Sequence, residues 1–398
     1  MTRTPNLPIY LDYNATTPPA PAVIDAMLPW LRGGFGNPSS AHAYGRIAHD
    51  AVARARHEVA QFIGAHDDEV IFTGGGSEAT NHALKGLAFA QLQSTQRRAL
   101  QIAYSAIEHP ATVATALALR HFGFAPQSVT VDRCGVVDLG ALAAVLREPT
   151  LVVSVMHANN ETGVIQPISA IAAAAKAAGA LLHVDASQSA GKLPVDVMAL
   201  GADLLTLAGH KLYAPKGVGA LYVRRGIHLE PLIHGAGHES GRRAGTENVP
   251  YIVALGAACR MASSDLEAES ARQRALRDRL WNRILARMGE RAVLNGWPAE
   301  CLPNTLNVSF VGVSGAELLA SIPEIAASTG SACHDGRVQF SPVLTAMNVD
   351  AAVAVGAIRL SLGRQTTEDE VDRAAHLLAA RALELNTMSR AQISSQSL

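Results

Sequence analysis

The 398-residue sequence lacks an excess of one charge sign, a long hydrophobic run and a pattern of paired cysteines. Its formal net charge is -1, so no basic stripe indicates a direct contact with nucleic acid. The most apolar segment, 171–182, is interrupted by Lys176 and Gly179 and is too short to cross a bilayer. No apolar core of a signal peptide follows Met1. These absences predict a cytoplasmic protein without membrane association.

Metal-binding patterns are missing as well. The 15 histidines include no HExxH spacing, and the four cysteines include no CxxC. Without an export signal, these cysteines are expected to be reduced thiols rather than disulfides. We therefore expect no metal site. The cysteines are Cys134, Cys259, Cys301 and Cys333.

Strand and helix patterns alternate from residue 69 to residue 207, with strands expected at 151–156, 180–185 and 203–207. Such alternation predicts an α/β fold with a mostly parallel sheet between layers of helices. After residue 250 a long helical region is followed by shorter strands and a closing helix at 366–385, which predicts a smaller α+β domain. We assign 20–255 to a large domain, 1–19 with 256–388 to a small domain, and 389–398 to a disordered tail.

Lysine is scarce, with five in the chain, and Lys211 follows an apolar strand at 203–207. Burial disfavours the ammonium form and lowers its pKa, leaving an amine nucleophile. Such an amine could form a Schiff base with an aldehyde cofactor. A lysine that extends its charge to solvent from a strand end is the alternative.

Other polar groups also follow expected strands. Gly74–Gly76 and Ser77 precede a helix and fit a phosphate site, although an ordinary tight turn is equally compatible. Asp185 ends a strand and could face a protonated pyridine nitrogen, or could cap the next turn. His109 and the loop 157–163 follow further strands, where structural roles compete with ligand binding.

Two late residues complete the candidates. Cys333 lies among small residues beside His334, a setting that favours a reactive thiol. Arg359 interrupts an apolar strand and could bind a substrate carboxylate through two hydrogen bonds. An intramolecular ion pair is the alternative for this arginine.

In combination these motifs resemble the pyridoxal-phosphate (PLP) cysteine desulfurases of the NifS/IscS type, within the class V aminotransferase group. The resemblance extends from 10–18 to 361–364 and keeps the order of the family's motifs. It implies PLP-transferase fold type I, with a seven-stranded type of sheet in the large domain. The motifs are FGNPSS (35–40), HANNETG (157–163), HVDASQ (183–188), GHKLYAPKG (209–217), RRAGTEN (242–248) and STGSAC (328–333).

The resemblance also implies roles around the cofactor ring. Lys211 would hold PLP as a Schiff base and then carry protons. Asp185 would face the pyridinium nitrogen, Gln188 the phenolic oxygen, and His109 would stack on the ring and assist proton transfer. Asn160 would also border the cofactor.

Phosphate and substrate contacts follow in the same way. The phosphate would be held by Gly76, Ser77 and His210, together with Thr246 of the neighbouring subunit in a homodimer. The carboxylate of L-cysteine would be bound by Asn160 and Arg359. Cys333 would take the sulfur as a persulfide, leaving L-alanine, and pass it to a sulfur-acceptor protein.

Two departures from the family pattern bear on this prediction. Ala208 stands where a phosphate-binding serine is usual, which removes one hydrogen bond worth ~1–2 kcal/mol unless Ser77 or Thr206 compensates. The residues after Cys333, with His334 and the SPVL run at 341–344, are more similar to selenocysteine lyases and some specialised desulfurases than to the usual Ser/Thr-rich continuation of a desulfurase. The alternatives to a cysteine desulfurase are a selenocysteine lyase, a class V aminotransferase without sulfur release, and a scaffold protein without cofactor.

Overall fold

The computed structural model describes residues 7–93, 100–296, 298–329, 331–334 and 337–396, with the backbone alone for 331–334, 337–340 and 389–396. Its α-helices are α1 (Pro21–Arg32), α2 (Ala43–Ile63), α3 (Gly76–Gln93), α4 (Pro110–Leu119), α5 (Leu139–Val145), α6 (Ile168–Ala177), α7 (Val197–Leu200), α8 (Val249–Met288), α9 (Gly315–Ala320), α10 (Pro342–Ala346), α11 (Ala351–Ala354) and α12 (Glu368–Gln396). Its strands are β1 (Ile9–Tyr10), β2 (Val70–Thr73), β3 (Gln101–Ser105), β4 (Ala125–Val129), β5 (Thr150–Met156), β6 (Leu181–Asp185), β7 (Leu204–Ala208), β8 (Gly219–Val223), β9 (Ala292–Leu294), β10 (Thr305–Phe310), β11 (Ile325–Ala326), β12 (Ser328–Thr329), β13 (Ser331–His334), β14 (Arg337–Phe340) and β15 (Ala357–Ser361).

A seven-stranded sheet with the order β2-β8-β7-β6-β5-β3-β4 forms the centre of the larger part of the molecule. The strand pairs from β4 to β7 are parallel, whereas β8 is antiparallel to both of its neighbours. Strand β2 therefore runs in the same direction as the parallel strands. The predicted α/β fold with a mostly parallel sheet is confirmed, and the carboxyl ends of β2 and β3–β7 all meet at one edge of the sheet.

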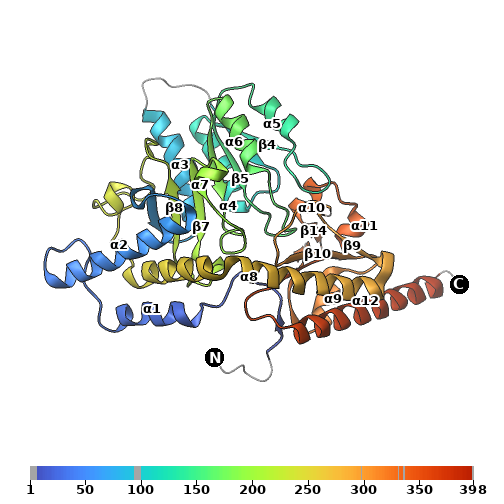
Figure 1. The fold of residues 1–398 in the computed structure, drawn as a ribbon. Coiled ribbons are helices and arrows are strands. Elements are labelled where there is room, and N and C mark those ends of the chain that lie inside the picture. The colour runs from blue at the N-terminus through green and yellow to red at the C-terminus, as the bar shows by residue number, and fades with distance from the viewer. Residues whose placement is uncertain (1–6, 94–99, 297, 330, 335–336, 397–398) are drawn as a thin grey trace.

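Helices cover both faces of this sheet (Figure 1). On β5, Val153 and Val155 pack into the core shared with α2, α6 and α8, whereas Val152 packs into the core shared with α3 and α4. Because side chains alternate across a strand, a strand buried on both sides has to be apolar at nearly every position. This requirement explains the continuous valine and leucine runs in the sequence.

A second, antiparallel sheet with the order β12-β15-β10-β9 packs on a separate core. That core combines Ile9 and Leu11 from the start of the chain with residues from 276–382. Helix α8 runs beneath both parts of the molecule (Figure 1) and has non-helical backbone angles at Asp265 (φ -139°, ψ 18°). Its first half contributes to the large core and its second half to the small one. The domain boundaries at 19/20 and 255/256 stay a prediction.

Some elements differ from the sequence expectation. Strand β4 occupies Ala125–Val129 rather than 128–132, because Val131 forms a bridge with Val137 around the turn at Gly135. Helix α12 continues to Gln396, past the expected end at 385 and through most of the tail predicted to be disordered. Alanine, arginine and glutamine within 389–396 favour helix, and proline is absent there. No helix in the described chain has the length and apolar character that a membrane span needs.

Candidate active site

One cavity of about 780 Å³ opens at the sheet edge where the carboxyl ends of the parallel strands meet. It gathers most of the site residues predicted from the sequence, although they are far apart along the chain. Open α/β sheets hold their ligands at this edge. The predicted residues that border the cavity are Gly76, Ser77, His109, Asn160, Asp185, Gln188, His210, Lys211 and Arg359.

Lys211 lies in a short 3₁₀ turn, Gly209–Lys211, immediately after β7. Its Nζ donates hydrogen bonds to the backbone carbonyls of Asn14 and Ala15, the latter at 3.0 Å. Burial, and then the positive charge of Arg359, lower the pKa of Lys211 to about 8. The side chain is therefore held inside the cavity rather than extended into solvent, and more of it is a neutral amine near neutral pH than for an ordinary lysine.

Asp185 ends β6 and is 8% exposed. Its Oδ1 accepts a hydrogen bond from the backbone N–H of Ser187 at 2.9 Å, as expected for a carboxylate that caps a turn. The same carboxylate borders the cavity. The two roles left open by the sequence are thus compatible, because capping the turn fixes the direction of the side chain.

His109 is the N-cap of α4, and its Nδ1 accepts from the backbone N–H of Ala111 at 3.1 Å. Since that N–H can only donate, the neutral ring carries its proton on Nε2. Burial, and then the charge of Lys211, lower the pKa of His109, while Asp185 opposes this shift. The cavity is therefore bordered by a neutral imidazole.

The amino end of α3 offers N–H groups of the kind expected at an anion site. The first N–H groups of a helix have no partner within the helix, and Gly76 and Ser77 carry two of them. Gly219 at the start of β8 has to be glycine, because an added Cβ would lie 2.8 Å from the backbone of Gly75. Helix and strand can therefore approach closely around this end of the cavity.

Acidic and basic side chains both border the cavity. Glu78 borders the cavity, but it pairs with Arg243 at 3.0 Å and accepts from the N–H of Gly74 at 2.7 Å. Lys216 and His210 also border the cavity. His210 is neutral, because burial and the nearby lysines lower its pKa to about 4.

Ala208 lies against the amino end of α3. Its Cβ is 3.1 Å from the position that a Cβ would take if residue 76 carried a side chain. Thr206 does not replace the missing serine, because its Oγ1 contacts His183 Nε2 at 2.9 Å and Thr80 Oγ1 at 3.3 Å. Ser187 borders the cavity instead, and its Oγ lies 3.2 Å from the same Cβ position at Gly76. A hydroxyl is therefore available beside the anion site from a residue that the sequence did not indicate.

Gln188 is oriented by a lysine that the sequence analysis did not select. Lys192 is buried, and its Nζ donates to the carbonyl oxygen of Gln188 at 2.7 Å and to Gln188 Oε1 at 3.5 Å. The amide nitrogen of Gln188 consequently points the other way and donates to the carbonyl of Asn14 at 3.0 Å. Burial, and then the charges of Lys211 and Arg359, lower the pKa of Lys192 to about 7.

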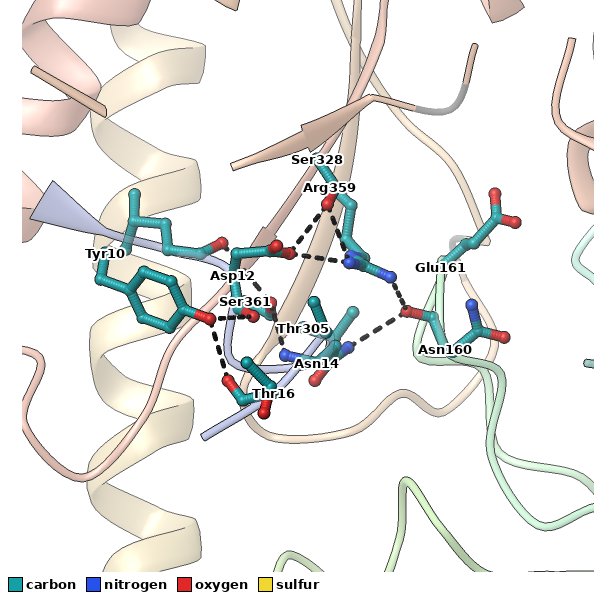
Figure 2. Close-up of polar contacts among 12 residues, drawn as sticks. Tyr10, Asp12, Asn14, Thr16, Asn160, Glu161, Thr305, Ser328, Arg359 and Ser361 are labelled. Atoms are coloured by element: carbon teal, nitrogen blue, oxygen red, sulfur yellow. Dashed lines mark hydrogen bonds and ion pairs between the residues drawn. The ribbon is translucent and has the colours of Figure 1, made fainter. Parts of the chain in front are cut away.

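Arg359 makes the ion pair that the sequence left as an alternative and also borders the cavity (Figure 2). Its NH2 lies 2.7 Å from Asp12 Oδ1 and 3.0 Å from Ser328 Oγ, and its NH1 lies 3.0 Å from the carbonyl oxygen of Asn160. Its Nε is buried and has no hydrogen-bond partner among the described residues. The Nε–H of this guanidinium is therefore left for an acceptor that the described residues do not supply.

Glu108 is a buried acid beside His109. Its Oε1 accepts from the N–H of Met156 at 2.7 Å, and burial raises its pKa well above the usual range. The nearby charge of Asp185 raises that pKa further. Glu108 therefore supports the cavity wall through its hydrogen bond to the backbone of Met156, which borders the cavity.

Thr246 does not border the cavity, and the side chain of Cys333 cannot be placed relative to it. Thr246 is exposed on a segment that is fixed to the large part by Arg243–Glu78 and Arg56–Glu239 ion pairs. Cys333 lies on β13, opposite Val338 of β14, and its side chain lies outside the described residues. The roles predicted for these two residues stay predictions. No cluster of three or more potential metal ligands occurs in the part of the chain that is described.

Comparison with known proteins adds three findings. Residues 9–374 match the model of the aminotransferase class-V family. Cysteine desulfurase IscS of Salmonella schwarzengrund (strain CVM19633) and that of Klebsiella pneumoniae (strain 342) are each 45% identical over 377 residues, or 94% of this chain and 92% of the relative. A solved NifS-like protein superposes with a TM-score of 0.86 at 38% identity, covering 96% of this chain and all of that one. SspA in complex with cysteine superposes with a TM-score of 0.78 at 36% identity, covering 89% of this chain and 98% of that one.

The lowered pKa of Lys211 predicts how cofactor capture depends on pH. Because the amine form is the nucleophile, the rate at which cofactor-free protein binds PLP should rise with pH around a midpoint of about 8. In an Arg359→Gln variant the midpoint should move upward, since the positive charge that lowers this pKa is removed. Stopped-flow absorbance of the lysine-bound cofactor measures both rates. A midpoint near that of a free lysine in the parent protein would contradict the prediction.

Restoring a hydroxyl at position 208 should strengthen phosphate binding. In Ala208→Ser, the loss of PLP during dialysis should slow by about tenfold, the effect of one added hydrogen bond to a charged group. The exposed Ala199→Ser variant is the matched control and should lose PLP at the parental rate. Equal loss from Ala208→Ser and the parent would mean that Ser187 and the end of α3 already satisfy the phosphate.

Proposed function

Because this chain belongs to the aminotransferase class-V family, we propose that the cavity at the sheet edge is where it converts L-cysteine to L-alanine. The protein is a PLP-dependent cysteine desulfurase. The observation that supports this placement is the meeting of Lys211, Asp185 and Arg359 at one cavity, from β7, β6 and β15. An amine, a carboxylate and a guanidinium are the groups that a PLP enzyme needs for its cofactor and an amino-acid substrate.

The residues present fit the cofactor. Lys211 supplies the amine for the PLP aldehyde, Asp185 an anion for its ring nitrogen, and the amino end of α3 the N–H groups for its phosphate. Gln188 Nε2 uses one of its two N–H groups on the carbonyl of Asn14, and the second can donate to the phenolic oxygen. When bound, PLP supplies the electron sink that allows the Cα–H and Cβ–S bonds of cysteine to break.

Arg359 is the proposed receptor for the substrate carboxylate. It is 9% exposed, and its Nε lacks a partner among the described residues although three other acceptors surround the guanidinium. A buried N–H without an acceptor costs free energy that a bound carboxylate would recover. Asn160 also borders the cavity and is proposed to contact the same ligand.

Cys333 is the proposed sulfur acceptor within the protein. Its thiolate forms a bond to the substrate sulfur while the substrate Cβ–S bond breaks. The electron pair of the broken bond stays with the substrate carbon, which takes a proton and becomes the methyl group of alanine. Lys211 Nζ moves the proton from Cα, and the neutral His109 ring assists. The products are L-alanine and a Cys333 persulfide, whose outer sulfur passes to a sulfur-acceptor protein.

We further propose that the active unit is a homodimer. Exposed apolar side chains of Phe35, Tyr44 and Ile47 lie on the loop 33–42 and the start of α2. This loop contacts the segment that carries Thr246, through Ser39 Oγ and His238 Nδ1 at 3.3 Å. Apolar surface of this kind marks an interface, and a second copy placed there would receive the Thr246 hydroxyl at its phosphate. Cys333 has to be a free thiol to take the sulfur, and a reducing compartment keeps thiols free, so we propose a cytoplasmic location.

The Cys333→Ala variant tests the proposed reaction. It should still bind L-cysteine, because Lys211 and Arg359 are intact, but alanine formation should fall by at least ~10³-fold since no thiolate takes the sulfur. Alanine from L-cysteine and from L-selenocysteine, quantified separately in parent and variant, is the measurement. Full turnover of cysteine by the variant would overturn the proposal. Loss confined to cysteine, with selenocysteine turnover retained, would favour a selenocysteine lyase, and transfer of the amino group to a keto acid would favour an aminotransferase.

A mixed dimer tests the contribution of Thr246. Thr246→Val should lose PLP about tenfold faster than the parent, because one hydrogen bond to a charged group is removed. Hybrid dimers of Thr246→Val with Lys211→Ala contain one complete site if Thr246 acts across the interface, and this site should retain PLP like the parent. Fast PLP loss from the hybrid, or a monomer by light scattering, would contradict the dimer model.

A further inference from the structure

Asp12 and Glu161 are two acids for which the proposed reaction has no direct use, and each contacts one end of the segment that carries Cys333. This segment consists of β13 and β14, paired antiparallel from Ser331–Phe340 to His334–Arg337. Ser328 on β12 precedes it and Ser341 follows it. The two serines therefore mark the two ends of the Cys333 segment, and both side chains are described.

At the first end, three side chains form a closed triangle (Figure 2). Arg359 NH2 donates to Asp12 Oδ1 at 2.7 Å and to Ser328 Oγ at 3.0 Å, and Ser328 Oγ donates to Asp12 Oδ1 at 2.9 Å. Arginine can only donate, so the single proton of the Ser328 hydroxyl is directed at Asp12. The start of the Cys333 segment is thus tied to the ion pair of Arg359.

At the second end, Ser341 is the N-cap of α10. Its Oγ accepts from the N–H groups of Val343 and Leu344 at 3.1 and 3.2 Å, which occupies both lone pairs. Its proton is therefore directed at Glu161 Oε2, which lies 2.5 Å away. The hydrogen bond has one possible direction, and it needs an acceptor at position 161.

Both ends of the Cys333 segment are linked to the guanidinium of Arg359. Glu161 follows Asn160, whose carbonyl oxygen accepts from Arg359 NH1 at 3.0 Å, and the carbonyl of Glu161 itself accepts from Asn307 Nδ2 at 3.1 Å. Strand β15, which carries Arg359, pairs with both β12 and β10. The two ends of the Cys333 segment are therefore connected to opposite sides of Arg359.

We propose that Asp12 and Glu161 are positioning residues that fix both ends of the Cys333 segment relative to the arginine that binds the substrate carboxylate. This inference rests on the proposed roles of Cys333 and Arg359. The carboxylate and the sulfur belong to one small substrate, so a nucleophile anchored to the carboxylate receptor is held at a set distance from the sulfur. Reacting atoms need to approach to about 3–3.5 Å, and small misplacements reduce rates strongly.

The test uses Glu161→Ala, the conservative Glu161→Gln, Ser328→Ala, and the exposed Glu324→Gln as a matched control. Ser328→Ala breaks the link to Asp12 while leaving the Arg359–Asp12 ion pair in place. Hydrogen exchange of the peptide 331–340 in protein without substrate reports how firmly the segment is held. Rapid-quench analysis of persulfide formation in the PLP-loaded protein reports the transfer step.

In Glu161→Ala and in Ser328→Ala, exchange in 331–340 should become about tenfold faster and persulfide formation about tenfold slower, the effect of one lost hydrogen bond to a charged group. The KM for L-cysteine should stay within about twofold of the parent, because Arg359 keeps Asp12 and the carbonyl of Asn160 as partners in both variants. Glu161→Gln retains an acceptor oxygen and should behave like the parent, as should Glu324→Gln.

Parental exchange and persulfide rates in both alanine variants would overturn the inference, as would an increase in KM without a change in the transfer step. If Glu161→Ala does not fold, Ser328→Ala decides in the same way. A different result would contradict the proposed function, namely release of sulfur from cysteine by Cys333→Ala. That result would leave the hydrogen-exchange measurement on 331–340 interpretable.

Discussion

The burial of a permanent positive charge at Arg359 is the constraint on which the site depends. A guanidinium that is 9% exposed requires acceptors, because an unpaired buried charge costs several kcal/mol. The chain meets this need from three distant places: Asp12 near its start, Asn160 after β5, and Ser328 before the Cys333 segment. Solvation of one side chain thereby joins the N-terminal segment, the large sheet and the small sheet at the cavity.

The other groups at the site come from the large sheet. They meet there because the strands that precede them run in the same direction. Since β2 and β3–β7 run the same way, the groups that follow them meet at one edge without long loops. Polar contacts inside the sheet keep this edge in register. His183, neutral because burial lowers its pKa to about 4, bridges Ser154 at 2.8 Å and Thr206 at 2.9 Å across three neighbouring strands. The strand that ends in Asp185 is thus fixed to the strands on either side of it.

Local sequence patterns predicted much of the large sheet and several of the residues at the cavity. Apolar runs located β5, β6 and β7 within one or two residues, and the polar residues after them indicated Lys211 and Asp185. Pairs between distant residues were not predictable, because no local pattern marks Asp12 as the partner of Arg359, 347 residues later, or Glu161 as that of Ser341, 180 residues later. Ser187 and Lys192 were missed for a related reason. Their importance comes from the cavity wall and from burial, not from a motif.

Three basic side chains at the site, Lys192, Lys211 and Arg359, respond differently to their shared environment because lysine and arginine differ in chemistry. Burial, and then the charges of Lys211 and Arg359, lower the pKa of Lys192, and burial, and then the charge of Arg359, lower the pKa of Lys211. A lysine can respond by releasing its proton, whereas arginine stays charged in proteins. The shared environment therefore leaves Arg359 charged, as its proposed role as carboxylate receptor requires, and moves Lys211 toward the amine form that its proposed role requires. An Arg359 placed farther away would leave Lys211 more protonated, so the closeness of the two groups would serve the proposed nucleophile as well as the substrate.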